Sequence, residues 1–398
     1  MLQYGPGGET PKHPYLESDM STKPLRVVLM GTGPFAVPSF RQIHREGHVI
    51  LAVVSRPPVE KPSRDKLPAE GPVMLWAKES GLSVHTPASI NSEEMLVWLR
   101  GLEPDLLVVC DYGQILSREA LGTARLGGIN LHGSLLPRHR GAAPVQWTIL
   151  AGDTCAGVSV IHMTPRLDAG PVIESVRTEI CPGESAEELE LRLSQLGVKP
   201  TLLSMERLAD LHEGQSLPGV LQDQGLSTKA PRLSKSDGQL ACGYSVALID
   251  RQIRGLQPWP GVFGELQLAN GKTVRMIVHR ATPVEDPDQS IASRLKLARD
   301  DFPIGCIIFG ATAQELGVAV GQPKQWVGVV VGDGILALDV VQIAGKGAMQ
   351  AKDFVQGYGK QVGLRFQVSS DPHPLLERMA ACATQSGGLP VAGEGKSG

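Results

Sequence analysis

Three polar side chains in the middle of the chain could together catalyse an acyl transfer. Asn130 and His132 stand at the end of the apolar segment 127–132, and Asp168 lies in a Leu-Asp-Ala-Gly turn after the segment 158–163. Side chains alternate along a strand, so Asn130 and His132 point to the same side of it. An amide NH₂ can stabilise the oxyanion of a tetrahedral intermediate, and an imidazole can move protons near neutral pH. A carboxylate at Asp168 could orient the imidazole and favour its protonated form.

These residue types alone leave a structural role open. An Asn and a His at a strand end are more often structural than catalytic, and Asp168 could simply hydrogen-bond its own backbone. Two further histidines lie nearby in the sequence. His162 belongs to an apolar strand and is interpreted as a satisfied core residue, whereas His139 lies in a loop and is interpreted as a surface residue.

Alternating strands and helices are predicted for residues 23–213. This order is typical of a parallel, doubly wound α/β sheet with helices on both faces. Ligands of such sheets bind beyond the carboxyl ends of the strands, which is where Asn130 and His132 lie. Apolar runs predict strands at 25–30, 49–54, 106–110, 127–132 and 158–163, and helices are expected from Gly33 to about Gly47 and over 73–80, 91–101 and 184–213.

A second, smaller domain is predicted after a linker at 214–231. Residues 232–366 contain short apolar runs separated by Gly and Asp, with a hairpin signal at Asn270–Gly271, and this pattern is typical of a small β-barrel. Trp259 is interpreted as a plug in the core of that barrel. Residues 1–22 are polar and rich in Gly and Pro and are expected to form a disordered extension, and residues 367–398 a flexible tail.

The composition indicates a soluble globular protein in a reducing compartment. Hydrophobic residues make up 42% and charged residues 20%, and no apolar run is long enough to span a membrane. The six cysteines form no Cys-x-x-Cys pair, so neither a zinc nor a redox motif is visible. The net charge of −3 argues against non-specific coating of nucleic acid. Residues 232–366 hold 15 Lys and Arg against 12 Asp and Glu, a surplus of +3 that fits a solvated surface as well as one that faces a nucleic acid.

The segment 130–146 reads NLHGSLLPRHRGAAPVQ and strongly resembles the signature of the folate-dependent formyltransferases. Their shared core is an Asn and a His two residues apart, followed by Ser-Leu-Leu-Pro. Gly133 and the RGAAPVQ run resemble the branch that acts on methionyl-tRNA, and Asp168 matches the family's Leu-Asp-x-Gly element. The resemblance covers about residues 25–359, because further motifs stand in family order: GTGPFAVPSF at 31–40, YGQIL at 112–116, APRLSK at 230–235, PWP at 258–260, GDGIL at 332–336 and AGKGAMQAKDF at 344–354.

The resemblance implies a transferase that moves the formyl group of 10-formyltetrahydrofolate to the amino group of methionyl initiator tRNA, in translation initiation and without a metal. It implies a Rossmann-like domain, an OB-like C-terminal domain that binds tRNA, and a cytoplasmic monomer. Asn130, His132 and Asp168 would be the catalytic set. The folate-binding residues implied by the resemblance are Ser134, Leu135, Leu136, Pro137, Val109, Asp111, Tyr112, Gly113 and Gln114.

Two basic regions would contact tRNA. In the family, the loop at 56–72 is an inserted element that wedges against the acceptor stem through an arginine flanked by glycines. Arg64 takes that place here, but Ser63 and Asp65 replace the glycines and make the loop stiffer and less basic. The candidates for phosphate contacts, which position a nucleic acid without reading its sequence, are Arg64, Lys66, Arg254, Lys346 and Lys352.

Two other activities are open alternatives. GTGPFA fits a dinucleotide fingerprint, but Ser55 and Arg56 stand where an acidic residue is expected about 20 positions further on. An arginine there could suit NADP, so an NADP-dependent oxidoreductase is one alternative. A formyltransferase for a sugar nucleotide or another small amine is the nearer one, and the loop at 56–72 and the AGKGAMQAKDF motif favour tRNA over it.

Overall fold

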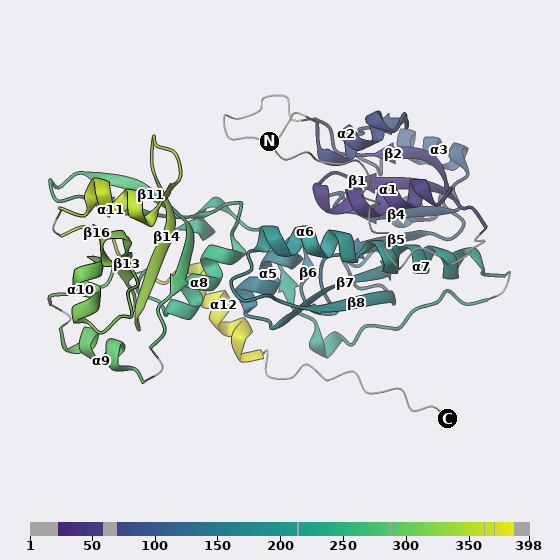
Figure 1. Ribbon diagram of the computed structural model, residues 1–398. Coiled ribbons are helices and arrows are strands. Elements are labelled where there is room, and N and C mark those ends of the chain that lie inside the picture. The colour runs from purple at the N-terminus through teal and green to yellow at the C-terminus, as the bar shows by residue number, and fades with distance from the viewer. Residues whose placement is uncertain are drawn as a thin grey trace, which may run out of the picture.

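The computed structural model describes residues 23–385 except 59–69, 213–214, 287, 299, 362 and 370. An α/β region and a β-barrel lie side by side, with helices between them (Figure 1). The predicted extension at 1–22 lies outside the described residues, as do Arg64 and Lys66. None of the described helices is long and apolar enough to cross a membrane.

The α/β region is built on a seven-stranded sheet in the order β3-β2-β1-β4-β5-β7-β8. The strands from β3 to β5 are parallel, but β7 pairs antiparallel with β5 and with β8. The doubly wound sheet is confirmed, but it is not parallel throughout. The connection after β5 does not return the chain to the end of the sheet at which β5 begins, so β7 runs in the opposite direction. The strands are β1 (Arg26–Gly31), β2 (Val49–Val54), β3 (Val84–His85), β4 (Leu106–Cys110), β5 (Gly128–His132), β7 (Cys155–His162) and β8 (Val172–Glu179).

Helices cover both faces of this sheet, because alternate strand residues are buried on opposite sides. Val27 and Leu29 of β1 belong to one apolar cluster, with α1, α2, α6 and α7, and Val28 and Met30 belong to another, with α3 and α4. The predicted helix at 184–213 is two helices that meet at Gly197, where a β-carbon would stand 2.8 Å from Leu131. The helices are α1 (Val37–Arg45), α2 (Pro72–Glu79), α3 (Glu93–Leu102), α4 (Arg118–Leu121), α6 (Ala186–Leu196) and α7 (Val198–Ala209).

The C-terminal barrel is an antiparallel sheet in the order β12-β13-β14-β11-β10-β16. It closes because Cys306, next to β12, bridges to Arg365 of β16. The predicted hairpin at Asn270–Gly271 joins β10 to β11. Trp259 is 56% exposed, so its interpretation as a core plug is wrong. The strands are β10 (Val262–Gln267), β11 (Thr273–Pro283), β12 (Ile307–Phe309), β13 (Val327–Val330), β14 (Ile335–Ile343), β15 (Met349–Gln350) and β16 (Arg365–Phe366), and the helices are α9 (Ser290–Leu297), α10 (Gly310–Glu315) and α11 (Ala351–Tyr358).

Three helices join the two regions: α5 (Pro144–Ala151), α8 (Val246–Gly255) and α12 (Pro374–Gln385). Trp147 and Leu150 of α5 belong to the same apolar cluster as the barrel. α12 packs on both α5 and α8 and buries Leu375, Leu376 and Met379 completely. The prediction of a flexible tail is therefore wrong for these residues, since their apolar spacing gives the helix a face that the interface covers.

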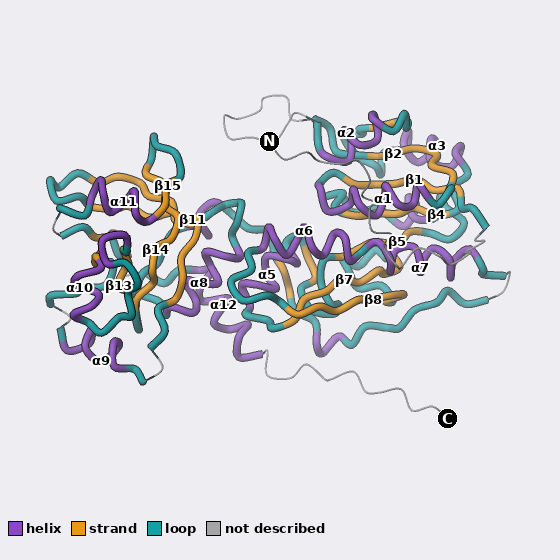
Figure 2. Tube along the Cα trace, in the orientation of Figure 1, coloured by secondary structure: helices purple, strands orange, loops and turns teal. Residues whose placement is uncertain are grey.

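The segment between the two regions runs back along the edge of the α/β sheet. Figure 2 shows it as a long loop beside β8, where Val220 pairs with Val172. It ends in the short strand β9 (Lys229–Ala230), which pairs with β6 (Arg140–Gly141). The segment between the two regions is thus paired, through β9, with the loop that follows β5.

Candidate active site

A cavity of about 540 Å³ opens at the carboxyl ends of β4 and β5. Asn130, His132 and Asp168 all line it, so the structure brings together the three residues predicted to do chemistry. Asn130 and His132 face the cavity from the same side of β5, as the alternation along a strand requires.

Asp168 is held beside His132 by its own loop and by two neighbours. Its Oδ1 atom lies 3.8 Å from Nδ1 of His132, and both side chains are almost fully buried. Its Oδ2 atom accepts a hydrogen bond of 2.9 Å from the backbone N–H of Gly141, and Gln222 donates to its carbonyl oxygen. Asp168 adopts a left-handed backbone with a φ of 49°, a conformation that non-glycine residues adopt mainly where the surroundings enforce it. The carboxylate is therefore fixed toward His132.

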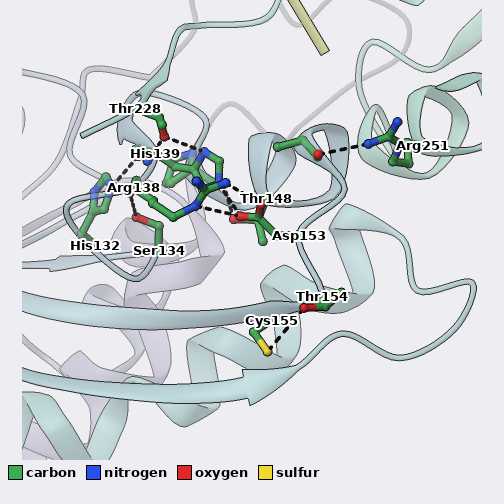
Figure 3. A network of polar contacts seen from close by, with 12 residues as sticks. His132, Ser134, Arg138, His139, Thr148, Asp153, Thr154, Cys155, Thr228 and Arg251 are labelled. Carbon is green, nitrogen blue, oxygen red and sulfur yellow. Dashed lines mark hydrogen bonds and ion pairs between the residues drawn. The ribbon is translucent and has the colours of Figure 1, made fainter. Parts of the chain in front are cut away.

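The other ring nitrogen of His132 faces a peptide carbonyl. Nε2 lies 2.9 Å from the carbonyl oxygen of His139, and because a carbonyl only accepts, the proton belongs on Nε2. Nδ1 is then the nitrogen that can gain or lose a proton on the side of Asp168. His139 itself is buried and its imidazole contacts Asp153 (Figure 3), so its interpretation as a surface residue is wrong.

Two carboxyl groups that also line the cavity interact with each other. Burial raises the pKa of Asp111 to about 6, although the Gly33 backbone and Arg56 act to lower it. Burial, and then the charges of Asp111 and Glu187, raise the pKa of Glu190 to about 7. The Asp111 side chain is exposed on the cavity wall, so it is the protein packed around the cavity that raises its pKa. The cavity therefore holds an acidic pair that is partly protonated near neutral pH.

Sequence reasoning missed Glu190. It lies on α6 four residues after Ala186 and three before Leu193, which are both fully buried, so it belongs to the inward face of the helix. An acidic residue on an apolar helix face was the signal that could have revealed it. Arg166 and Arg232, which also line the cavity, were missed as well.

The residues predicted to bind folate fall into two groups. Val109, Asp111, Tyr112, Gly113 and Gln114 line the cavity. Ser134 to Pro137 do not line it, because this segment forms a turn that is hydrogen-bonded to its neighbours. The Ser134 hydroxyl donates to the carbonyl oxygen of Arg138, and the Leu136 N–H donates to the Ser159 hydroxyl. Their placement in a folate site stays a prediction.

The described residues predicted to contact tRNA differ in their exposure. Lys346 and Lys352 are exposed near α11, and the Lys346 ammonium lies over the ring of Tyr358. Arg254 instead contacts Asp250 at 2.7 Å and donates to the carbonyl oxygen of Glu184, so its guanidinium is engaged inside the protein. Nε2 of His162 donates a hydrogen bond of 2.8 Å to the carbonyl oxygen of Pro218, which agrees with a satisfied core residue.

The glycine turn after β1 does not favour a dinucleotide. The Asp111 carboxylate accepts a hydrogen bond from the Gly33 backbone, which is a group that would otherwise face a pyrophosphate. A carboxylate in that place also repels phosphate. Arg56 is beside Gly113 and lines the cavity. The alternative of an NADP-dependent oxidoreductase therefore loses its structural basis.

An amide, an imidazole and a carboxylate that converge in a cavity of a doubly wound sheet define an enzyme of the acyl-transfer class. The chain belongs to the formyl transferase family: residues 25–203 match the formyl transferase model and residues 232–359 match the model of the formyl transferase C-terminal domain. It is 43% identical over 345 residues to a protein of Rhodopirellula baltica named methionyl-tRNA formyltransferase, a match that covers 85% of this chain and 96% of the relative.

Two solved structures share the fold. An N-formyltransferase from Helicobacter canadensis, in complex with folinic acid and dTDP-3-aminofucose, matches 79% of this chain and 99% of its own with a TM-score of 0.52 and 14% identity. HypX from Aquifex aeolicus, in complex with tetrahydrofolic acid, matches 88% of this chain and 49% of its own with a TM-score of 0.51 and 12% identity.

Proposed function

We propose that this chain transfers the formyl group of 10-formyltetrahydrofolate to the amino group of methionyl initiator tRNA, for translation initiation in the cytoplasm. The observation that carries the proposal is the 43% identity along 96% of a relative with that name. The two structures at 12 and 14% identity argue only for the fold.

In the proposed mechanism, the amine nitrogen attacks the formyl carbon and a tetrahedral intermediate forms. Asn130 donates a hydrogen bond to the oxyanion, and His132 supports it in its protonated form. Asp168, whose carboxylate faces Nδ1 at 3.8 Å, favours that form and orients the ring. When the bond between the formyl carbon and N10 of the folate breaks, the proton lost by the amine ends on N10. No electrons are transferred in the overall reaction.

The proposed substrates are recognised by different parts of the chain. Val109 and residues 111–114 would hold the folate in the cavity, and Lys346 and Lys352 would contact tRNA phosphates from the barrel. We propose that the protein acts as a monomer.

The test is a formylation assay with 10-formyltetrahydrofolate and charged initiator tRNA, run with the wild type and with Asn130→Ala and His132→Ala. We expect transfer to the tRNA, and a loss of about 10²- to 10³-fold in kcat on removal of the oxyanion donor Asn130. Folate-dependent transfer to a sugar nucleotide amine but not to tRNA would keep the chemistry and overturn the acceptor. Full activity of both variants would overturn the site.

A further inference from the structure

The loop that follows β5 contacts the ring of His132 through the backbone of His139. Nε2 of His132 contacts the carbonyl oxygen of His139 at 2.9 Å, so the orientation of this one peptide group determines which ring nitrogen carries the proton. His139 has a left-handed φ of 58°, which an ordinary residue adopts only when its surroundings hold it there. Its backbone N–H donates to the Thr228 hydroxyl at 2.9 Å, a contact supplied by the linker.

The side chain of His139 is fastened to Asp153. Nε2 of His139 lies 2.7 Å from Oδ2 of Asp153, and these side chains are only 3% and 5% exposed. Asp153 lies in the turn between α5 and β7, outside the loop that contains His139. Figure 3 shows the contact between His139 and Asp153 on the far side of the loop from His132.

Asp153 also holds the residue before His139. The Arg138 guanidinium contacts Oδ1 of Asp153 at 2.5 Å through Nη2 and Oδ2 at 3.3 Å through Nε. Burial alone would raise the pKa of Asp153, but the hydrogen bonds and charges of His139 and Arg138 outweigh it and the pKa is lowered. One buried carboxylate thus fastens two consecutive residues of the loop.

None of Arg138, His139 and Asp153 lines the cavity, so none of them is placed to touch a substrate bound there. We propose that Asp153 and His139 are positioning residues: they hold the peptide carbonyl that fixes the tautomer and orientation of His132. The proposal rests on the proposed function in one respect, which is the catalytic role of His132.

The proposal predicts a defect confined to the chemical step. In Asp153→Asn the carboxylate charge that holds Arg138 and His139 is lost, and the carbonyl of residue 139 is free to tilt away from His132. Misplacing a catalytic group by about 1 Å can cost about 100-fold in rate, so we expect kcat to fall about 10- to 100-fold with little change in KM for either substrate.

Glu184→Gln is the matched control. It removes the charge of another buried carboxylate of the same region, Glu184, which pairs with the half-buried Arg192 at 2.8 Å away from the loop. We expect both variants to lose stability and only Asp153→Asn to lose kcat. His139→Asn is the second variant if Asp153→Asn does not fold, since Asn tolerates a left-handed backbone and Arg138 keeps its partner.

A readout without substrate separates this proposal from the proposed function. ¹⁵N NMR of labelled histidines, with the His132 signal assigned by His132→Gln, reports which ring nitrogen carries the proton. For the neutral His132 ring we expect the proton on Nε2 in the wild type and in Glu184→Gln, and a mixture of tautomers in Asp153→Asn or His139→Asn. An unchanged His132 signal together with unchanged kcat would overturn the positioning role, whatever acceptor the enzyme uses.

Discussion

The carboxylate of Asp111 occupies the space in which a side chain on Gly33 would begin, well inside any van der Waals contact with a β-carbon there. It also accepts a hydrogen bond from the Gly33 backbone, and Asp111 has a left-handed φ of 48°. The turn after β1 and the end of β4 therefore fix each other, and together they form one wall of the cavity.

Gly33→Ala should displace the Asp111 carboxylate into the cavity, because the added methyl group and the carboxylate cannot share the space. We expect the free energy of unfolding to fall by about 1–3 kcal/mol, the range for an overpacked site, and KM for the folate to rise several-fold. Urea unfolding and steady-state kinetics measure both. Gly101→Ala is the control, because a β-carbon at Gly101 of α3 meets no other atom within 4 Å. Unchanged stability and KM in Gly33→Ala would contradict this prediction, because they would mean that the Asp111 carboxylate moves aside without cost.

Glu190 should make the protein less stable as the pH rises. Its pKa is about 7 in the fold against an ordinary value of 4.5, so the folded state binds the proton more tightly than the unfolded state. Stability is therefore lost between about pH 4.5 and pH 7 and stays low above that. Glu190→Gln removes this loss, so we expect the variant to melt a few degrees above the wild type at about pH 8 and at nearly the same temperature at about pH 5.

The control for that pH effect is Glu315→Gln, on the exposed side of α10. It should change the melting temperature equally at both pH values. A Glu190→Gln variant that gains nothing at the higher pH would contradict the burial of a charged Glu190 in the cavity wall.

Local rules were enough to predict that Asn130 and His132 share one side of a strand, where both line the cavity, because the alternation of side chains needs only neighbouring residues. The burial of His139 could not be predicted in this way. It depends on Asp153, which is 14 residues away, and on Thr228, which is 89 residues away, and only the folded linker brings Thr228 to the loop. The engagement of Arg254, a candidate for a phosphate contact, could not be predicted for the same reason: its contact with the carbonyl of Glu184 crosses between the two regions.

α12 forms part of the interface between the two regions. Its sequence, PLLERMAACATQ, is rich in apolar residues, and Leu376 is completely buried between the two regions. We expect Leu376→Ala to lower the free energy of unfolding by about 2–5 kcal/mol, the cost of a cavity at a buried leucine. Leu297→Ala is the matched control, since Leu297 is 89% exposed on α9, and it should cost less than about 0.5 kcal/mol. Equal losses, measured by urea unfolding, would mean that α12 contributes no packing energy in solution.

Lys352 and Arg254 should differ in their effect on tRNA, although both are basic residues of the C-terminal part of the chain. Lys352 is exposed, whereas the Arg254 guanidinium is engaged with Asp250 and the carbonyl of Glu184. A phosphate contact releases counterions, so Lys352→Ala should raise KM for the tRNA several-fold and reduce the slope of log KM against log salt by about one. Arg254→Ala should leave that slope unchanged and lower the melting temperature instead, because it leaves Asp250 unpaired. A reduced salt slope in Arg254→Ala would mean that its guanidinium leaves Asp250 to bind a phosphate when the tRNA arrives.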